Sequence, residues 1–213
     1  MIALKCQNWR AGGAPTPPGP YDYEVMYCYC DNARAIVDTG WKLNYGEFQL
    51  RIDTVCYPLV QSDKRRFVFG SYSGRASFVE IDAASTFSLG EAHGVSTVII
   101  GERYDVHCER SINGVSATVK DSVGNIVFSG TRTTYSGTET NNYALFNLSD
   151  NRTYGDSDLI GVGRFQMETV DKYGAPLCSY IPCVKDGVAC YYDELSETFK
   201  YATNGNLVAG PRI

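Results

Sequence analysis

The sequence predicts an all-β protein in which two antiparallel sheets pack face to face. Beyond Tyr21, β-branched and aromatic residues come in short runs, and apolar and polar positions alternate within them with a period of two. Gly, Asn, Asp and Ser separate these runs, as in antiparallel strands joined by tight turns. The length of 213 residues suits a single sandwich domain, which we assign to residues 21–213.

The first clear strand is expected at Phe48–Ile52, where the alternation places Phe48, Leu50 and Ile52 on one buried face. Hairpin turns are expected at Asn113-Gly114 and Val123-Gly124-Asn125, because Gly and Asn tolerate the positive φ of tight turns. Helix should be scarce, with one weak candidate near Asp193–Thr198. Further strands are expected at Arg66–Gly70, Ser77–Ile81, Ser96–Ile100, Asp105–Arg110, Ala117–Lys120, Ile126–Phe128, Tyr143–Phe146, Gly163–Glu168, Cys178–Ile181 and Ala189–Tyr192.

Residues 1–20 differ in composition from the rest of the chain. The stretch 11–20, AGGAPTPPGP, disfavours helix and strand and is expected to be an extended Pro/Gly linker. A short arm with Cys6 and Trp9 precedes it, and an exposed Trp is costly unless it is buried against something. We therefore expect residues 1–20 to be an attachment arm that docks on a neighbouring subunit through Trp9 and Cys6. Folding back onto its own domain is the equal alternative.

Composition excludes several classes of function. A formal net charge of -5 and a pI near 5.1 give no positive field for phosphates, so nucleic acid is not an expected partner. No stretch reaches the roughly 18 apolar residues of a membrane span, and the N-terminus turns polar at Lys5, so neither a membrane segment nor a secretory signal is expected. Without export, most of the 8 cysteines are expected to be reduced and buried as small apolar residues.

Glu80 and Asp82 are the sharpest catalytic candidates, because laminarinase-type glycosidases carry the pattern Glu-x-Asp-x-x-Glu on one strand. Ser85 stands where that pattern needs its last Glu, and a serine cannot act as the acid that protonates the glycosidic oxygen. We therefore expect Glu80 and Asp82 to face solvent, with Val79 and Ile81 inside. The domain is not expected to be an enzyme.

Neither histidine is expected to take part in catalysis. His93 is expected in a turn, and His107 lies in a predicted strand beside Cys108, so these two neighbours point to opposite faces and cannot pair. The most oxygen-rich loop, Asp150–Asp158, supplies too few ligands for calcium. No metal or cofactor is therefore expected, although a structural calcium site built from distant segments stays open.

Aromatic residues point to recognition. The chain has 16 Tyr and 2 Trp, and Tyr combines an apolar ring with a polar tip that suits contacts with sugars. The alternative is that these tyrosines fill sheet faces and subunit contacts. The loops that we expect to bind a ligand contain Tyr72, Arg75, Tyr135, Asn141, Asn142 and Tyr143.

The C-terminal segment resembles a known family. A strand ends at Ile181-Pro182-Cys183, a turn follows at Lys185-Asp186-Gly187, and Tyr191, Asp193, Asn204-Gly205 and Ala209-Gly210-Pro211 come after it. This order is similar to the C-terminal signature of the laminin-G-like, concanavalin-A-like jelly-roll domains of bacteriophage and prophage virion proteins. Ala35–Gly40 resembles that family's front strand and turn. Phe69-Gly70, Tyr104-Asp105-Val106 and Gly161–Phe165 follow in the family's order, so that the resemblance spans about residues 23 to 213.

The resemblance implies a jelly-roll sandwich in a non-enzymatic phage virion surface protein, a fibre or decoration component. Its lectin-like domain would bind host-surface or mucus carbohydrate, its arm would bind other virion subunits, and assembly into a homo-oligomer stays open. Such a protein is made in the host cytoplasm and ends at the virion surface. Two alternatives remain, namely a decoration protein that binds only other subunits and, with less support, a degenerate glycoside hydrolase.

Overall fold

A computed structural model describes residues 20–31, 35–42, 49–71, 77–89, 92–111, 114–133, 141–146, 160–170 and 174–213, without the side chains of residues 77 and 78. Several predicted features lie outside these described residues. They are the arm with Cys6 and Trp9, almost all of the Pro/Gly linker, the oxygen-rich loop at 150–158, and the candidate ligand residues Tyr72, Arg75 and Tyr135.

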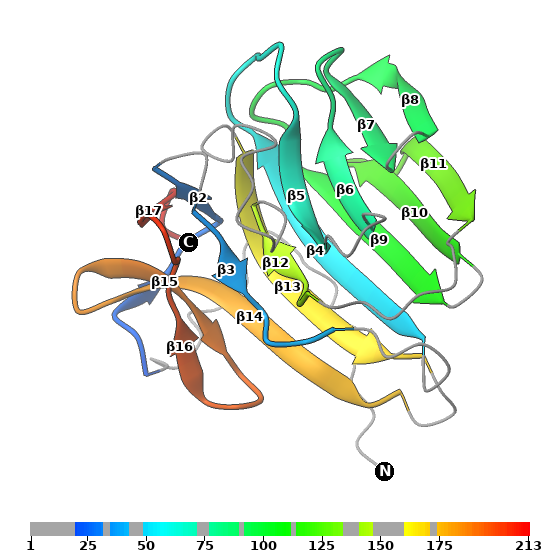
Figure 1. The fold of residues 1–213 in the computed structure, drawn as a ribbon. Coiled ribbons are helices and arrows are strands. Elements are labelled where there is room, and N and C mark those ends of the chain that lie inside the picture. The colour runs from blue at the N-terminus through cyan, green and yellow to red at the C-terminus, as the bar shows by residue number, and fades with distance from the viewer. Residues whose placement is uncertain are drawn as a thin grey trace.

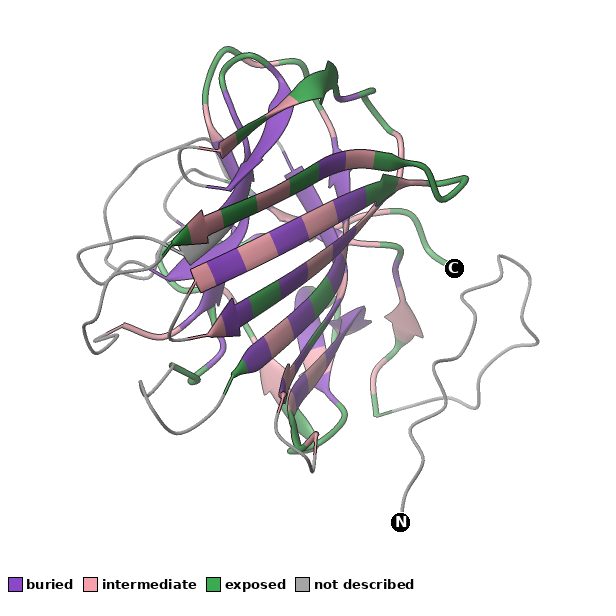
Figure 2. Cartoon of the chain, turned by 90° about the vertical axis from the view of Figure 1, so that its right-hand side faces the viewer, coloured by how far each residue is buried: buried purple, intermediate pink, exposed green. Residues whose placement is uncertain are grey.

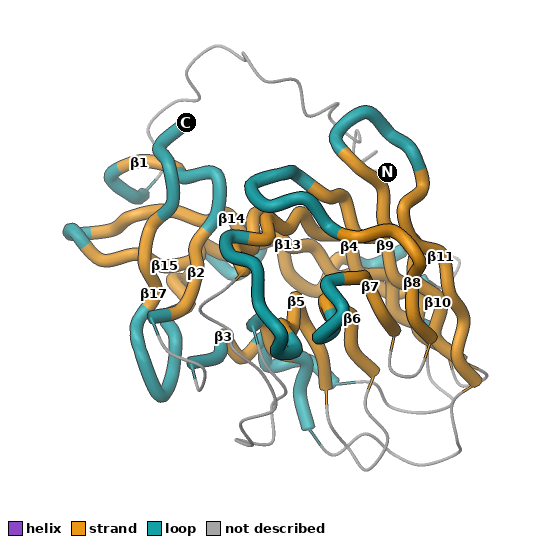
Figure 3. The backbone as a smooth tube through the Cα atoms, turned by 90° about the horizontal axis from the view of Figure 1, so that it is seen from above, coloured by secondary structure: helices purple, strands orange, loops and turns teal. Residues whose placement is uncertain are grey.

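The described residues form strands and turns and contain no helix (Figure 3), so none of their elements is a helix that could cross a membrane. The predicted all-β class is confirmed. The strands are β1 (Tyr23–Glu24), β2 (Cys28–Cys30), β3 (Val37–Asp38), β4 (Leu50–Pro58), β5 (Arg66–Ser71), β6 (Ser77–Ile81), β7 (Thr86–Leu89), β8 (Ala92–Thr97), β9 (Tyr104–Ser111), β10 (Gly114–Asp121), β11 (Ile126–Thr133), β12 (Ala144–Leu145), β13 (Ile160–Thr169), β14 (Pro176–Lys185), β15 (Val188–Asp193), β16 (Thr198–Lys200) and β17 (Leu207–Ala209).

These strands build two antiparallel sheets (Figure 1). The large sheet has 11 strands, with the main order β11-β10-β9-β4-β13-β14-β15-β16, and it is extended where β1 pairs with β14 and β2 pairs with β13 and β17. The small sheet has 6 strands in the order β3-β12-β5-β6-β7-β8. Most neighbours on this main path are consecutive in sequence, and the exceptions are the two pairs made by β4, which lies between β9 and β13.

The core lies between the two sheets, where aromatic rings from opposite layers meet. Phe69 of β5 contacts Phe165 of β13 edge-on with ring centroids 5.8 Å apart, and Phe87 of β7 contacts Tyr104 of β9 at 5.0 Å. Burial of such large apolar side chains is the main stabilising term in a sandwich of this size. The 7 described cysteines are all buried, as predicted, and none of them is bonded to another.

Most predicted strands are confirmed, and four local predictions differ from the structure. The strand expected at Ser96–Ile100 ends earlier, because the chain folds into the β7–β8 hairpin and leaves the strand after Thr97. The strand expected at Tyr143–Phe146 is only the two residues of β12. His93, expected in a turn, lies in β8. The weak helix candidate after Asp193 is a turn between β15 and β16.

The alternation of buried and exposed residues is clearest in the large sheet (Figure 2). Leu50 and Ile52 of β4 are buried in the core as predicted, whereas Arg51 and Asp53 point away from it. In β9, β10 and the first part of β4, the outward side of the large sheet therefore presents every second residue.

Candidate functional site

The outward side of the large sheet carries a row of polar side chains in strict register across six strands. Each residue of this row is paired with the next through the strand ladders. Five spacings of about 4.8 Å give the row a length of about 24 Å. None of its members is fully buried. This first row consists of Ser129 (β11), Thr118 (β10), His107 (β9), Asp53 (β4), Gln166 (β13) and Ser179 (β14).

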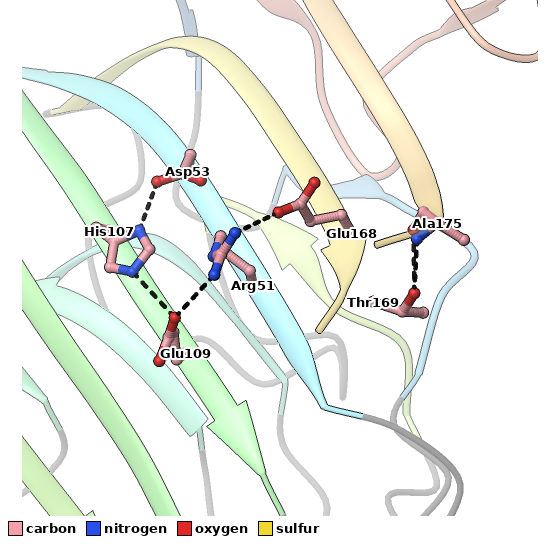
Figure 4. Close-up of polar contacts among 7 residues, drawn as sticks. All are labelled: Arg51, Asp53, His107, Glu109, Glu168, Thr169 and Ala175. Atoms are coloured by element: carbon pink, nitrogen blue, oxygen red, sulfur yellow. Dashed lines mark hydrogen bonds and ion pairs between the residues drawn. The ribbon is translucent and has the colours of Figure 1, made fainter. Parts of the chain in front are cut away.

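A second polar row lies beside the first, displaced by two residues along each strand. At its centre, Arg51 donates a hydrogen bond from one guanidinium nitrogen to Glu168 at 2.8 Å and from another to Glu109 at 3.3 Å (Figure 4). Burial acts to lower the pKa of Arg51, but these hydrogen bonds and the two carboxylate charges outweigh it and the pKa is raised. The row consists of Thr131 (β11), Ser116 (β10), Glu109 (β9), Arg51 (β4) and Glu168 (β13). We call the two rows together the polar face.

His107 connects the two rows. Its Nδ1 lies 2.7 Å from Oδ1 of Asp53, in the first row, and its Nε2 lies 3.6 Å from Oε1 of Glu109, in the second (Figure 4). The hydrogen bond to Asp53 is the main cause of a raised pKa of His107, and burial opposes it. The imidazole is thus held between two carboxylates and keeps its proton to a higher pH than a free histidine does.

The first row continues toward β15 through short polar contacts. Gln166 donates to Oγ of Ser179 at 3.3 Å, and that hydroxyl donates to Oε2 of Glu194 at 2.7 Å. The backbone N–H of Ser179 also donates to Oδ1 of the buried Asp193. These contacts fix the side chains at this end of the row, so their positions are set before a ligand arrives.

Three tyrosines lie on the same outward side, toward the other end of the strands. Tyr57 is four residues beyond Asp53 on β4, about 13 Å away along the strand. The ring of Tyr27 lies 4.8 Å from that of Tyr57 and 6.5 Å from that of Tyr29, between centroids. Tyr27 and Tyr29 are half-buried. We call these three residues the tyrosine cluster.

Two glycines make room for the tyrosine cluster. A Cβ atom at Gly161 would lie 2.5 Å from Cδ2 of Tyr27, and one at Gly210 would lie 2.6 Å from Cε2 of the same ring. A side chain at either position would push the ring out of place. Gly161 faces Tyr57 in the β4–β13 ladder, so the glycine sets the height at which the Tyr27 ring lies over the sheet.

The polar face can hydrogen-bond a ligand, and each of its charged groups contacts one of opposite sign or a histidine. The carboxylates of Asp53, Glu109 and Glu168 surround the guanidinium of Arg51 and the imidazole of His107. With a neutral imidazole the five groups carry a net negative charge, so an anionic ligand is disfavoured. Among the described residues, no group of three or more His, Cys, Asp or Glu side chains is arranged to hold a metal ion.

Three of the ligand residues predicted from the loops are described by the structure, and they differ in how far they are buried. The prediction that Tyr143 is a surface contact is wrong, because this residue is 1% exposed and packs in the core. Asn141 and Asn142 are half-buried, and Asn142 donates to Oδ2 of Asp38 at 3.2 Å. These two asparagines belong to the segment next to β12 in the small sheet and are not part of the polar face.

The expectation that Glu80 and Asp82 face solvent is also wrong. Glu80 is fully buried and accepts two hydrogen bonds from Arg65, at 2.7 and 2.5 Å, and one from Ser88 at 2.9 Å. Burial raises the pKa of Glu80, which these hydrogen bonds oppose. The alternation argument failed because both sides of β6 are closed to solvent at this point, with Val79 and Ile81 buried on the inner side.

Asp82 has a structural role in the turn after β6. Its carboxylate accepts hydrogen bonds from the backbone of Ala84 and Thr86 and from the Thr86 hydroxyl, and it lies 2.8 Å from Nδ1 of His93. Burial opposes ionisation of Asp82, but the hydrogen bonds outweigh it and the pKa is lowered. His107 and Cys108 do lie on opposite faces, as predicted.

The polar face was not predicted from the sequence. Each of three strands carries two polar or charged residues two positions apart, namely Arg51 with Asp53, His107 with Glu109, and Gln166 with Glu168. That shared i, i+2 pattern is the available signal, because residues two apart in a strand point to one face. This pattern does not show which strands are neighbours in the sheet.

Comparison with known proteins gives distant structural likenesses. No protein-family model and no curated protein matches the sequence. A mutant of Trypanosoma rangeli sialidase displaying trans-sialidase activity aligns with a TM-score of 0.41 and 10% identity, over 56% of this chain and 20% of that chain. A full-length tailspike protein from a bacteriophage of Escherichia coli O157:H7 aligns with a TM-score of 0.45 and 12% identity, over 76% of this chain and 27% of that one. The chain thus spans about a quarter or less of these proteins, and likenesses this weak say nothing about its function.

Proposed function

We propose that the chain is a non-enzymatic carbohydrate-binding protein of a bacteriophage virion surface, and that a glycan lies along its polar face. The observation that carries this proposal is the pair of polar rows in register across neighbouring strands, with the tyrosine cluster on the same side of the sheet. Together they offer an extended ligand both hydrogen-bonding groups and aromatic rings.

Sugars fit this combination of groups. Each hydroxyl of a sugar both donates and accepts hydrogen bonds, and the first row offers hydroxyl, amide, carboxylate and imidazole groups. The C–H faces of a sugar ring pack on aromatic rings such as those of Tyr27 and Tyr29. Because the carboxylates outnumber the cationic groups on the polar face, the proposed ligand is an uncharged glycan, not a sulfated or carboxylated one.

The contacts of the carboxyl groups support binding without hydrolysis. Asp53, Glu109 and Glu168 each contact Arg51 or His107. A glycosidase needs one carboxyl that keeps a proton for the leaving oxygen. Burial raises the pKa of Glu80 in that direction, but this carboxyl is fully buried against Arg65 and does not reach a ligand.

The virion setting rests on the sequence pattern of the C-terminal segment. The residues that resemble the phage jelly-roll signature form the β14–β15 hairpin, its Asp186-Gly187 turn, and the chain end that pairs with β2 through β17. In the proposal, the arm at residues 1–20 attaches the domain to other virion subunits.

The test is glycan binding by the purified full-length chain and by variants of the polar face. The double variant Asp53→Ala, Gln166→Ala removes two hydrogen-bonding groups, worth about 1–1.5 kcal/mol each, and should weaken binding about 30- to 150-fold. Thr97→Ala, at an exposed site in β8 of the other sheet, is the matched control and should bind like the parent chain. Absence of binding across a broad array of neutral glycans, or an unchanged affinity in the double variant, contradicts the proposal.

A decoration protein that binds only other subunits is the second candidate, and one observation favours it. Exposed apolar side chains gather at one end of the sandwich, where the end of β4, the turn before β9 and the β10–β11 turn meet. Gly101 in the turn before β9 donates to the carbonyl of Pro58 at 2.8 Å, which joins two of these segments. The exposed residues are Val60, Ile99, Ile100, Val123 and Ile126.

This second candidate has its own test. Ile99→Asp and Val123→Asp place charges in the apolar end without touching the polar face. If the chain is purely a decoration protein, these variants lose binding to virion particles, and no variant of the polar face changes any measured interaction. Glycan binding that survives both apolar substitutions supports the first proposal instead.

A further inference from the structure

The β14–β15 hairpin brings two cysteines directly opposite each other. Its two-residue turn has positive φ at Asp186 (51°) and Gly187 (76°), the conformation of a tight hairpin turn that keeps adjacent strands in register. Cys183 and Cys190 form the third pair from this turn, after Lys185 with Val188 and Val184 with Ala189. No other two described cysteines face each other in the strand ladders.

The two sulfur atoms are in contact. They lie 3.6 Å apart, and both side chains are fully buried. The carbonyls of Pro182 and Val184 accept hydrogen bonds from the backbone N–H groups of Val25 and Asp22. Because successive residues of a strand direct their backbone groups to opposite sides, those of Cys183 point toward β15. Facing residues of this hydrogen-bonded kind have Cα atoms about 5.5 Å apart, which lies within the range of disulfides. Small side-chain rotations are enough to bring the sulfurs to bonding distance.

We propose that Cys183 and Cys190 form a cross-strand disulfide when the protein meets a small-molecule disulfide such as oxidised glutathione. One cysteine thiolate attacks a sulfur of the small-molecule disulfide and displaces one thiol. The second cysteine thiolate then attacks the resulting mixed disulfide at the protein sulfur and releases the second thiol. The protein loses two electrons and two protons, and the small-molecule disulfide is reduced to two thiols.

The surroundings of the pair suit this reaction. The two thiols share a hydrogen bond in which either sulfur can donate, and this contact lowers the pKa of Cys190. Oxidant reaches the pair when the hairpin opens locally. On its other side β15 pairs with β16 only from Tyr191 to Asp193, so among the described strands Val188–Cys190 have a ladder partner only in β14 (Figure 1).

The test is mass spectrometry of the native full-length chain after incubation with oxidised glutathione. The expected product has lost two hydrogen atoms and carries no glutathione. Trypsin cleaves after Lys185, between the two cysteines, so residues 173–185 and 186–200 should remain joined until a reductant is added. Because residues 173–185 also contain Cys178, the variant Cys178→Ala is the matched control and should still give the joined peptides.

Cys183→Ala and Cys190→Ala should each abolish the joined peptides. Two outcomes overturn the proposal in the unsubstituted chain: both thiols stay free after denaturation and alkylation, or oxidation stops at a glutathione adduct. Joined peptides that persist in Cys183→Ala would also overturn it, because they would assign the bond to Cys178.

Discussion

Replacing Arg65 with Met should destabilise the fold, because it leaves the Glu80 carboxylate buried without its cation. Arg65 donates from Nε and from a terminal nitrogen to the two carboxylate oxygens of Glu80, which is fully buried. Breaking a fully buried ion pair costs about 3–5 kcal/mol. The Arg65 side chain is 42% exposed and partly solvated, so we expect a loss of about 2–3 kcal/mol at neutral pH.

The loss should depend on pH in a defined direction. Burial already holds the pKa of Glu80 above its ordinary value, and Arg65 is the main group that opposes the shift. Without Arg65 the folded-state pKa rises further. A carboxyl with a raised folded-state pKa favours the folded state below its unfolded pKa of about 4.3, and this contribution is lost as the pH rises through the folded-state pKa. The deficit of Arg65→Met should therefore be largest near pH 7 and shrink toward pH 4.

Urea unfolding of the parent chain and the variant at several pH values measures this deficit. Arg103→Met is the matched control, since Arg103 pairs with the half-exposed Asp105 and should cost less than about 1 kcal/mol. Adding Glu80→Gln to Arg65→Met should recover part of the stability, because it removes the unpaired charge. A deficit below about 0.5 kcal/mol, or one that does not change between pH 4 and 7, would refute this view of Glu80.

Three further predictions concern the outward side of the large sheet and its support. Gly161→Ala should lower the free energy of unfolding by about 1–3 kcal/mol in urea titrations, because its Cβ would lie 2.5 Å from the Tyr27 ring; an unchanged midpoint would show that the ring moves freely. The pKa of His107 is raised in the folded state, so its protonation stabilises the fold below the unfolded-state pKa of about 6.5, and this effect is lost as the pH rises through the folded-state pKa. The melting temperature of Asp53→Asn should therefore fall further below that of the parent chain at pH 6 than at pH 8. Tyr191→Phe removes a buried hydrogen bond of 2.7 Å to the Val162 carbonyl and should cost about 1–2 kcal/mol by thermal or urea unfolding, whereas a neutral result would mean that the carbonyl finds another donor.

Local alternation was enough to predict which residues of most strands face the core. Leu50 and Ile52 are buried, and His107 and Cys108 lie on opposite sides, because side-chain direction in a strand depends only on the position along it. The same rule failed at Glu80, where both sides of β6 are closed, since alternation says nothing about what covers a strand. The rule also predicted a strand at Ser96–Ile100, whereas β8 ends at Thr97, because an apolar run does not show where a hairpin turns.

The polar face depends on strand order, which local patterns do not contain. Arg51 meets Glu109 and Glu168 only because β4 lies between β9 and β13, although 58 and 117 residues separate these partners in sequence. Tyr143 illustrates the opposite error, since an aromatic residue beside turn-forming residues was taken as surface and belongs to the core. The contacts of Arg51 and the burial of Tyr143 both depend on segments that are distant in sequence.

The alternation in β4, β9, β10 and β13 separates two kinds of evolutionary constraint. Over much of these strands every second residue packs into the core, and the residues between them point outward. Mutations such as those at Thr118 or Gln166 can therefore accumulate without creating cavities. These outward positions can therefore change one at a time while the folded scaffold stays intact.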